Sequence, residues 1–449
     1  MRINYFRSKL HGAFAVSAAA LVLTGCPETP CTGFAQTEVD TQSPVNGTIN
    51  VAIDGSGSMR GFSAVKDSTF HKTIEEIDTL LGVDSALGFA KSKTVVRRIG
   101  REGAPSMKMS SIPITSVLAA RNPEFFEDKK GKWPKVSSTI EQFVDKDPGS
   151  VDILISDLEP DNASIKQLLS AIKPKLQYEG EKKGWALGRS SAYAGNQLAL
   201  MGVQSRFDGG VFPAVQGSFQ SFPYRGKRPF YVLAIGPSAK VEKIVERLVQ
   251  DQKISPYLQV SRFASNPNNG TTAFINAAKT SLQPPNCLSP VFAISQGLSG
   301  KLRVQDPGSP SRWMLAQRVR GCNAQPMEIN FATTPVMGFG GTEINDPATL
   351  VASNADIQKG SITMNGMSGT ARVPIFSGAI SHVDISADAS KLDQMVWADW
   401  STSGTEMNGS KTQRLLALIK SIRGETDQYA LAKFGQRYSP TRVCAAVKG

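Results

Sequence analysis

Ile49-Asn-Val-Ala-Ile53 is a short apolar run that leads directly into Asp54-Gly-Ser56-Gly-Ser58-Met59. A run of this length, followed by glycines, predicts a buried strand that ends in a tight loop. The loop carries one carboxylate and two hydroxyls at alternate positions, so three oxygens can turn toward a common centre. Oxygen ligands of this kind suit a hard divalent cation such as Mg²⁺. The stretch therefore predicts a cation site at the end of a strand.

Strand and helix patterns alternate beyond this loop. A second buried strand is expected at Val151-Asp-Ile-Leu-Ile155, just before Asp157. Uniformly apolar strands that alternate with amphipathic helices are typical of a sheet covered on both faces. We therefore expect an α/β domain over residues 48–260 with a doubly wound, mostly parallel sheet. The other expected elements are strands at 94–99, 198–203 and 230–235 and helices at 64–82, 165–172 and 241–248.

The pattern changes near residues 261–270, which are rich in Ser and Asn. Short apolar runs bounded by turn residues follow, and their spacing predicts a β-sandwich over residues 285–405. Apolar residues at helical spacing then predict a closing helix within 406–449. These residues are Leu415, Leu418, Ile419 and Ile422.

The N-terminal segment is typical of an export signal. A basic start is followed by an apolar stretch, residues 13–23, that is too short to span a bilayer. The block Leu23-Thr-Gly-Cys26 resembles the lipobox of bacterial lipoproteins. The resemblance implies removal of residues 1–25, lipidation of Cys26 and a tether over 26–47. The alternative is an ordinary signal with a coincidental cysteine.

The expected location is therefore the cell envelope, with a lipid anchor in a bacterial membrane. Pro27 follows the cysteine at a position where inner-membrane lipoproteins usually carry Asp. This favours the outer membrane, facing the periplasm, over the inner membrane.

The charge balance is basic, with 50 Lys and Arg against 38 Asp and Glu and a formal net charge of +12. Three of the basic residues lie in the first 25, so the exported chain carries (50 − 3) − 38, or +9. An exported, lipid-anchored protein rarely meets nucleic acid, so we expect no nucleic-acid partner.

Four cysteines remain if Cys26 is lipidated. They are Cys31, Cys287, Cys322 and Cys444. An even number in an oxidising compartment suggests two disulfides, with three ways to connect them. We favour pairs Cys287–Cys322 and Cys31–Cys444, with free thiols as the alternative.

The loop of the opening stretch resembles the metal-ion-dependent adhesion site of the von Willebrand factor A domain. That site begins Asp-x-Ser-x-Ser, which Asp54, Ser56 and Ser58 match. The family adds an Asp after the fourth strand, which Asp157 matches, although Leu158 stands where the family more often has Gly. The resemblance covers about residues 48–250 and implies a doubly wound, Rossmann-like fold.

The family also supplies a Thr hydroxyl from a second loop. Its pattern places apolar residues two and six positions later, where Ile140 and Val144 follow Ser138. The resemblance therefore implies Ser138 as the ligand, with Thr139 as the alternative. Serine in place of threonine keeps a hydroxyl that can coordinate a cation.

The resemblance implies a binding protein. Ser56, Ser58 and Ser138 would contact Mg²⁺, or Mn²⁺ or Ca²⁺, directly, while two aspartates act through waters. The ion would then keep most of its charge for a carboxylate offered by a protein partner. We expect an exported, lipid-anchored protein that engages its partner in this way. The alternative is a metal-independent envelope scaffold or assembly protein with a vestigial metal site.

An enzymatic function is not expected, because the sequence shows no nucleophile–base pair. Of three histidines, His11 lies in the signal segment. His71 lies opposite the apolar stripe of its predicted helix and is expected at the surface. His382 begins a predicted strand and is expected to be structural.

Two other acidic and aromatic patterns have structural interpretations. Asp157, Glu159 and Asp161 could form a glycosidase pair, but this spacing after a strand favours helix capping and exposure to solvent. Trp397 and Trp400 could form a glycan shelf, although we expect them to pack in a core.

Overall fold

The structure is a computed structural model of the chain. It describes residues 47–264 and 389–434, except 84–85, 88–90, 104, 127–132, 160–161, 179–194, 213–220 and 404–405, together with the backbone of strands within 279–387 and 441–448. The predictions for the signal segment, for Cys26 and for the disulfides rest on residues or side chains outside this set.

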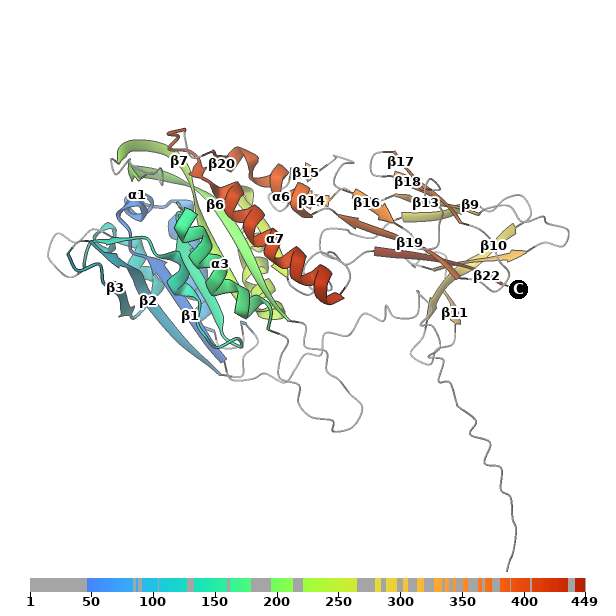
Figure 1. The fold of residues 1–449 in the computed structure, drawn as a ribbon, viewed down its shortest axis with the longest axis horizontal. Helices are drawn as coiled ribbons and strands as arrows, with labels where there is room; N and C mark the ends of the chain where they lie inside the picture. The colour runs from blue at the N-terminus through green and yellow to red at the C-terminus, as the bar shows by residue number, and fades with distance from the viewer. Residues whose placement is uncertain are drawn as a thin grey trace, which may run out of the picture.

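An eight-stranded sheet forms the centre of the N-terminal part (Figure 1). The strands are β1 (Gly47–Asp54), β2 (Ser92–Glu102), β3 (Met109–Ile114), β4 (Val136–Ser137), β5 (Val151–Ser156), β6 (Asn196–Val211), β7 (Phe222–Pro237) and β8 (Leu258–Ala264). Their order is β3-β2-β1-β5-β7-β6-β8, and β4 pairs with β2 outside this path. Together with the covering helices, the sheet confirms the α/β class.

The sheet is mixed in direction. Strand β1 pairs in parallel with both β2 and β5. The pairs β5–β7, β6–β7 and β6–β8 are antiparallel, as are β2–β3 and β2–β4. Parallel pairing is therefore confined to the three strands that lead into the predicted site.

Strands β6 and β7 differ from expectation because they form one long antiparallel hairpin. Parallel neighbours need a crossover of a dozen or more residues, usually a helix. The described residues between 203 and 230 contain no helix and instead extend the two strands. The expected parallel arrangement of 198–203 and 230–235 is therefore wrong.

Helices cover both faces of the sheet, and each face has its own apolar core. On one face lie α1 (Arg60–Ser63), α2 (Thr69–Leu81) and α4 (Ser238–Gln250). On the other lie α3 (Asn162–Leu176), α6 (Ala389–Trp397) and α7 (Leu415–Phe434). Short 3₁₀ helices are η1 (Gly57–Met59), η2 (Val117–Arg121), η3 (Pro123–Phe125), η4 (Ile140–Phe143), η5 (Ser255–Tyr257) and η8 (Ala398–Trp400).

Strand β1 shows why the sheet needs both layers. Val51 and Ile53 enter one core, while Ala52, between them, enters the other. Successive strand side chains point to opposite faces, so a uniformly apolar strand must be covered on both.

Helix α2 begins at an N-cap, where the Ser68 hydroxyl accepts a hydrogen bond from the amide of His71. The prediction that His71 lies at the surface is wrong, since its side chain is buried. Its Nε2 lies 3.2 Å from the carbonyl oxygen of Ser63, at the end of α1. The short helix α1 covers the flank of α2 that the periodicity alone assigned to solvent.

The two tryptophans are core residues, as expected. Trp397 is fully buried, and its Nε1 donates to the hydroxyl of Ser261 over 2.8 Å. A Cβ added at Gly202 of β6 would lie 2.7 Å from Trp397 and 2.8 Å from Trp400. Helices α6 and α7 therefore pack on the α/β sheet. The sequence assigned α6 to the β-rich domain and α7 to a separate C-terminal segment, with a boundary at residue 405, whereas both helices belong to one core of the α/β part.

The region between residues 279 and 387 is β-rich, as expected. Its strands are β9 (Lys279–Gln283), β10 (Leu288–Gln296), β11 (Leu302–Gln305), β12 (Trp313–Arg318), β13 (Met327–Ala332), β14 (Val336–Gly338), β15 (Thr342–Ile344), β16 (Leu350–Ser353), β17 (Ile362–Asn365), β18 (Ser368–Val373) and β19 (Ile380–Ala387). They form sheets of six, four and two strands. The last strand, β22 (Thr441–Lys448), joins the six-stranded sheet between β12 and β19.

Candidate functional site

Two parallel strands bring the predicted acidic residues to the same edge of the sheet. Ile53 of β1 lies opposite Ile155 of β5, so Asp54 follows the paired region directly and Asp157 follows it after Ser156. On the other side of β1, Asp54 lies opposite Ile99 of β2. The site therefore lies at the carboxyl ends of the central strands, where open α/β sheets usually bind ligands.

The Asp54 carboxylate organises the loop that follows it. Its Oδ1 accepts from the amide of Ser56 over 2.9 Å. Its Oδ2 accepts from the hydroxyls of Ser138 at 2.6 Å and Ser156 at 2.8 Å. The hydroxyls of Ser56 and Ser58 lie 3.1 Å apart. These hydrogen bonds hold the carboxylate in one orientation.

The second loop presents Ser138, and not Thr139, to Asp54. Short strand β4 pairs with the end of β2 and carries the chain to this point. The Thr139 hydroxyl instead accepts from Nε2 of Gln142 in the same loop. All five residues expected at the site lie in one cluster. Ser56 and Ser138 bond to Asp54, and Ser58 links Ser56 to Asp157.

Asp157 is buried beside the serine loop, and its carboxylate is only partly satisfied. Within the part of the chain that the structure describes, its Oδ2 has no hydrogen-bond partner. Burial raises the pKa of Asp157 to about 6, while Arg228 and a hydrogen bond from Ser58 act in the opposite direction. A buried carboxylate oxygen without a donor costs free energy, and a bound cation would remove that cost.

The backbone after Asp157 takes a conformation that normally favours glycine. Leu158 has φ of 46°, and its amide donates to the Ser156 hydroxyl over 3.1 Å. The side chain is fully buried in the core beneath α3. The left-handed turn is therefore kept here with leucine, and the burial of its side chain offsets the backbone strain.

A buried guanidinium supports the serine loop. Arg98 of β2 donates to the carbonyl oxygens of Gly55 at 2.8 Å, Phe125 at 2.9 Å and Pro134 at 3.0 Å. A Cβ at Gly55 would lie 2.6 Å from the guanidinium carbon. Glycine at this position therefore lets the loop lie directly on Arg98.

A second arginine lies at the other side of the site. Arg228 of β7 is fully buried, its Nη2 lies 3.8 Å from Oδ2 of Asp157, and the same nitrogen donates to Oε1 of Glu159. Burial raises the pKa of Glu159 to about 8, and Arg228 acts in the opposite direction. The prediction that Glu159 sits in solvent is wrong, since its side chain is 8 % exposed. Asp161 lies outside the described residues.

Sequence reasoning missed both Arg98 and Arg228. Each follows another basic residue that is not buried, Arg97 or Lys227, so the local sequence gives no sign that the second charge is covered. Arg98 is buried by the segment between β3 and β4, and Arg228 by residues 409–411. Neither covering segment has a sequence pattern from which its contact with the arginine could be predicted.

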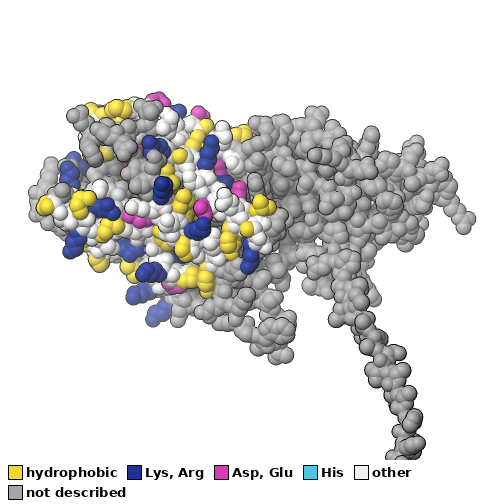
Figure 2. Space-filling view, viewed as in Figure 1, with side chains coloured by type: hydrophobic (Ala, Val, Ile, Leu, Met, Phe, Trp, Pro, Cys, Tyr) yellow, Lys and Arg dark blue, Asp and Glu magenta, His cyan; other side chains and the backbone are white. Residues whose placement is uncertain are grey.

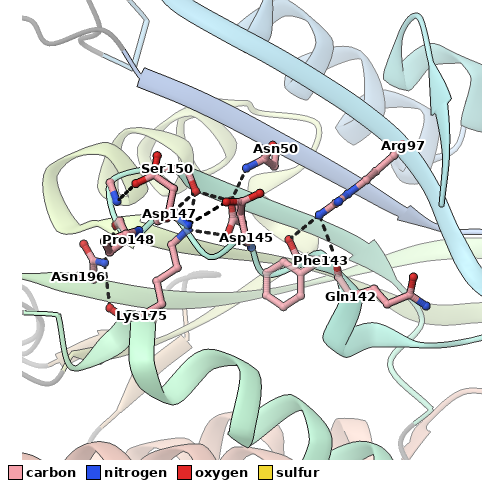
Figure 3. Close-up of polar contacts among 12 residues, drawn as sticks. Asn50, Arg97, Gln142, Phe143, Asp145, Asp147, Pro148, Ser150, Lys175 and Asn196 are labelled. Atoms are coloured by element: carbon pink, nitrogen blue, oxygen red, sulfur yellow. Dashed lines mark hydrogen bonds and ion pairs between the residues drawn. The ribbon is translucent and has the colours of Figure 1, made fainter. Parts of the chain in front are cut away.

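A different polar cluster lies at the opposite edge of the sheet (Figure 3). Lys175 of α3 pairs with Asp152 of β5, with Nζ 2.5 Å from Oδ2. The same carboxylate accepts from Asn50, Ser150 and the amide of Asp145. Since this buried pair is fully surrounded by partners, we interpret it as a structural anchor for α3.

Among the described residues, no group of three His, Cys, Asp or Glu side chains gathers as a metal site. The cluster at Asp54 and Asp157 has two carboxylates, and its remaining side-chain oxygens are hydroxyls. Such a set provides hard oxygen ligands with little negative charge, which fits Mg²⁺ better than a transition metal.

Comparisons with protein-family models, with curated proteins and with solved structures find no match to this chain. In the described part of the chain, no helix combines the length and the apolar character needed to cross a bilayer.

Proposed function

We propose that this chain is a binding protein that holds Mg²⁺ at the Asp54 cluster and engages a carboxylate of a protein partner through the ion. The observation that carries the proposal is the buried Oδ2 of Asp157, which has no hydrogen-bond donor among the described residues and belongs to the same cluster as three serine hydroxyls and a second carboxylate. The resemblance to the von Willebrand factor A domain supports the same assignment. The strands that carry the serine loop and Asp157, β1 and β5, pair in parallel as in a doubly wound sheet, whereas antiparallel pairs lie beyond β5 and beyond β2.

The hydroxyls of Ser56, Ser58 and Ser138 would hold the ion directly. The hydroxyl of Ser138 donates its proton to Asp54, which leaves its lone pairs free for a cation. Asp54 and Asp157 would act through waters and balance the charge. A bound Mg²⁺ would supply a strong positive charge for an exogenous carboxylate.

The proposal places the protein in the cell envelope, because of the signal segment and the lipobox that ends at Cys26. The lipid would anchor the chain to a bacterial membrane, with the outer membrane favoured. We further propose that the β-rich region folds as a sandwich and that the four remaining cysteines form disulfides.

Calorimetric titration of the EDTA-treated chain with Mg²⁺ or Mn²⁺ tests the site. We expect binding by the wild type and none by Asp54→Ala. Ser138→Ala should bind at least tenfold more weakly, while Ser138→Thr keeps the hydroxyl and binds like the wild type. Asp208→Ala removes an exposed carboxylate of β6 and is the matched control. Absence of binding by the wild type would contradict the metal site.

The scaffold alternative has one observation in its favour. Arg228 already provides a positive charge 3.8 Å from Asp157, so the chain partly compensates that carboxylate without a metal. A scaffold of this kind predicts that EDTA changes neither the melting temperature nor the association with partners. The Mg²⁺-dependent binding protein predicts that EDTA lowers both.

A further inference from the structure

Arg228 is held in place by more contacts than a simple counter-ion needs. Its Nη1 donates to the carbonyl oxygens of Gly409 at 2.9 Å and Lys411 at 3.4 Å. Its guanidinium carbon lies 5.6 Å from the ring centre of Phe207. With the Glu159 pair, these contacts fix the charge at the rim of the site.

Residues 409–413 form a strap that returns from the C-terminal part of the chain to this rim. The strap contacts the buried charges at both ends. At one end, the carbonyl oxygen of Gly409 accepts a hydrogen bond from Arg228. At the other, the amide of Gln413 donates to Oε2 of Glu159 over 3.3 Å. Between them, the Thr412 hydroxyl accepts from Tyr231 over 2.9 Å. The position of the strap therefore depends on the ion pair next to the metal site.

The strap also packs too closely on β7 to tolerate much displacement. A Cβ at Gly409 would lie 2.3 Å from ring atoms of Tyr224. Gly409 itself is buried, as are Thr412 and Gln413. A change in the balance of charges at Arg228 thus acts on a closely fitted segment and not on a loose loop.

We propose that Arg228 is a built-in cation that competes with the divalent ion for Asp157, and that it couples metal occupancy to the strap at residues 409–413. The inference rests on the proposed function. A divalent ion near Asp157 repels the guanidinium and draws the carboxylate away from it. The hydrogen bonds from Arg228 to the strap carbonyls then weaken. Because the coupling is reciprocal, a strap that is displaced from Arg228 should in turn strengthen metal binding.

The decisive variant is Arg228→Met combined with Glu159→Gln, which removes both charges of that pair and leaves Asp157 without its neighbouring cation. Calorimetry on the purified full chain, with Mg²⁺ as the probe, should show at least tenfold tighter binding than in the wild type. The matched control is Arg262→Met with Glu242→Gln. These residues form an ion pair with a 2.8 Å contact between β8, the last strand of the sheet, and helix α4. The control should bind like the wild type.

A second measurement needs no variant of Arg228. Hydrogen exchange of the wild-type amide of Gln413 should become faster when Mg²⁺ is added, because its acceptor, Glu159, shares Arg228. Asp54→Ala, which cannot hold the ion, should show no change. A merely structural arginine would leave this exchange rate independent of Mg²⁺.

The outcomes separate the two proposals. Mg²⁺ binding by the wild type, with equal or weaker binding by the double variant, would overturn the competition and leave the metal site standing. Unchanged exchange at Gln413 on saturation would overturn the coupling to the strap. Binding by neither protein would overturn both proposals. Binding by the double variant alone would support the competition at Asp157 and overturn the proposed Mg²⁺-dependent function of the wild type.

Discussion

At the scale of single residues, the contact between Gly55 and Arg98 sets how the serine loop lies. The guanidinium fills the space that a side chain at residue 55 would need, and three carbonyl oxygens hold it there. The loop therefore gains its shape from a strand neighbour as well as from its own glycines.

We expect Gly55→Ala to lower the free energy of unfolding by about 1–3 kcal/mol, because the added methyl overpacks against Arg98. The displaced loop should also bind Mg²⁺ more weakly. Urea unfolding and calorimetry measure the two effects. Gly424→Ala is the control, because nothing lies within 4 Å of its added Cβ in helix α7. It should raise stability by about 0.5–1 kcal/mol, and an equal loss in both variants would contradict the packing at Arg98.

His71 gives the protein a dependence on pH of known sign. Burial lowers its pKa from 6.5, so the unfolded chain takes up a proton more readily than the folded one. The contribution of neutral His71 to stability is present above about pH 6.5 and is lost as the pH falls below it.

His71→Gln should therefore lose less stability than the wild type between pH 7.5 and pH 5. Denaturant unfolding at several pH values measures the difference. The two proteins differ only at residue 71, so the difference between their curves reports the histidine and its charge interactions with neighbours such as Glu75. Parallel stability curves for the two proteins would show that His71 takes up its proton as easily when folded.

The residues that sequence could place are those whose role is local. The carboxylate and hydroxyl spacing of Asp54, Ser56 and Ser58 is readable because all three belong to one turn. Glu159 and Arg228 were misjudged or missed because their burial comes from residues 409–413, about 180 or more positions away. Long-range cover of this kind leaves no trace in the neighbouring sequence.

At the scale of secondary-structure elements, α3 is fastened to the sheet at its C-terminal end. Lys175 reaches Asp152 of β5 with both side chains buried, and the Lys175 carbonyl oxygen accepts from Asn196 at the start of β6 (Figure 3). One helix end is thus joined to two strands that are not neighbours in the sheet.

Lys175→Met should cost about 3–5 kcal/mol of stability, because it leaves the Asp152 carboxylate buried without its cation. Urea unfolding measures the loss. Arg225→Ala is the control, because its ion pair with Asp208 joins side chains that are 86 % and 52 % exposed. The control should change stability by less than about 1 kcal/mol. Similar small losses in both variants would show that Asp152 is stabilised by its hydrogen bonds alone.

The strand pattern predicted the elements better than their directions. Buried runs at 198–203 and 230–235 are strands, as expected, but their pairing was set by the segment between them. Described residues such as Arg206 and Tyr224 continue the strand pairing well beyond the buried runs. Their polar and aromatic alternation is weak evidence for a strand, which is why the hairpin was not foreseen.

At the scale of the whole molecule, the α/β part is completed by residues from far along the chain. Trp397, Leu418 and Ile419 fill the core between the sheet and its second helical layer. The charged side chains visible in Figure 2 lie mixed among apolar and polar ones over the described surface, with no single basic patch. The basic net charge of the chain is therefore not gathered on this face.

A truncation after residue 264 should fail to fold cooperatively, because it exposes the face that α6 and α7 cover. A truncation after residue 434 keeps both helices and should retain a cooperative transition and Mg²⁺ binding. Circular dichroism during thermal unfolding compares the two. Cooperative unfolding of the shorter chain would show that the second layer is dispensable.

The path of the chain between its two parts has a consequence for cleavage. The chain leaves the α/β part after β8, returns at α6, and leaves again after α7 to add β22 to the far sheet. The Ser261 hydroxyl of β8 donates to Asp393 of α6 over 2.5 Å. The point where the chain leaves the α/β part is therefore in contact with the point where it returns. A protease that cuts once between them would leave both fragments interleaved in the same cores. The nicked protein should migrate as one particle until it is denatured.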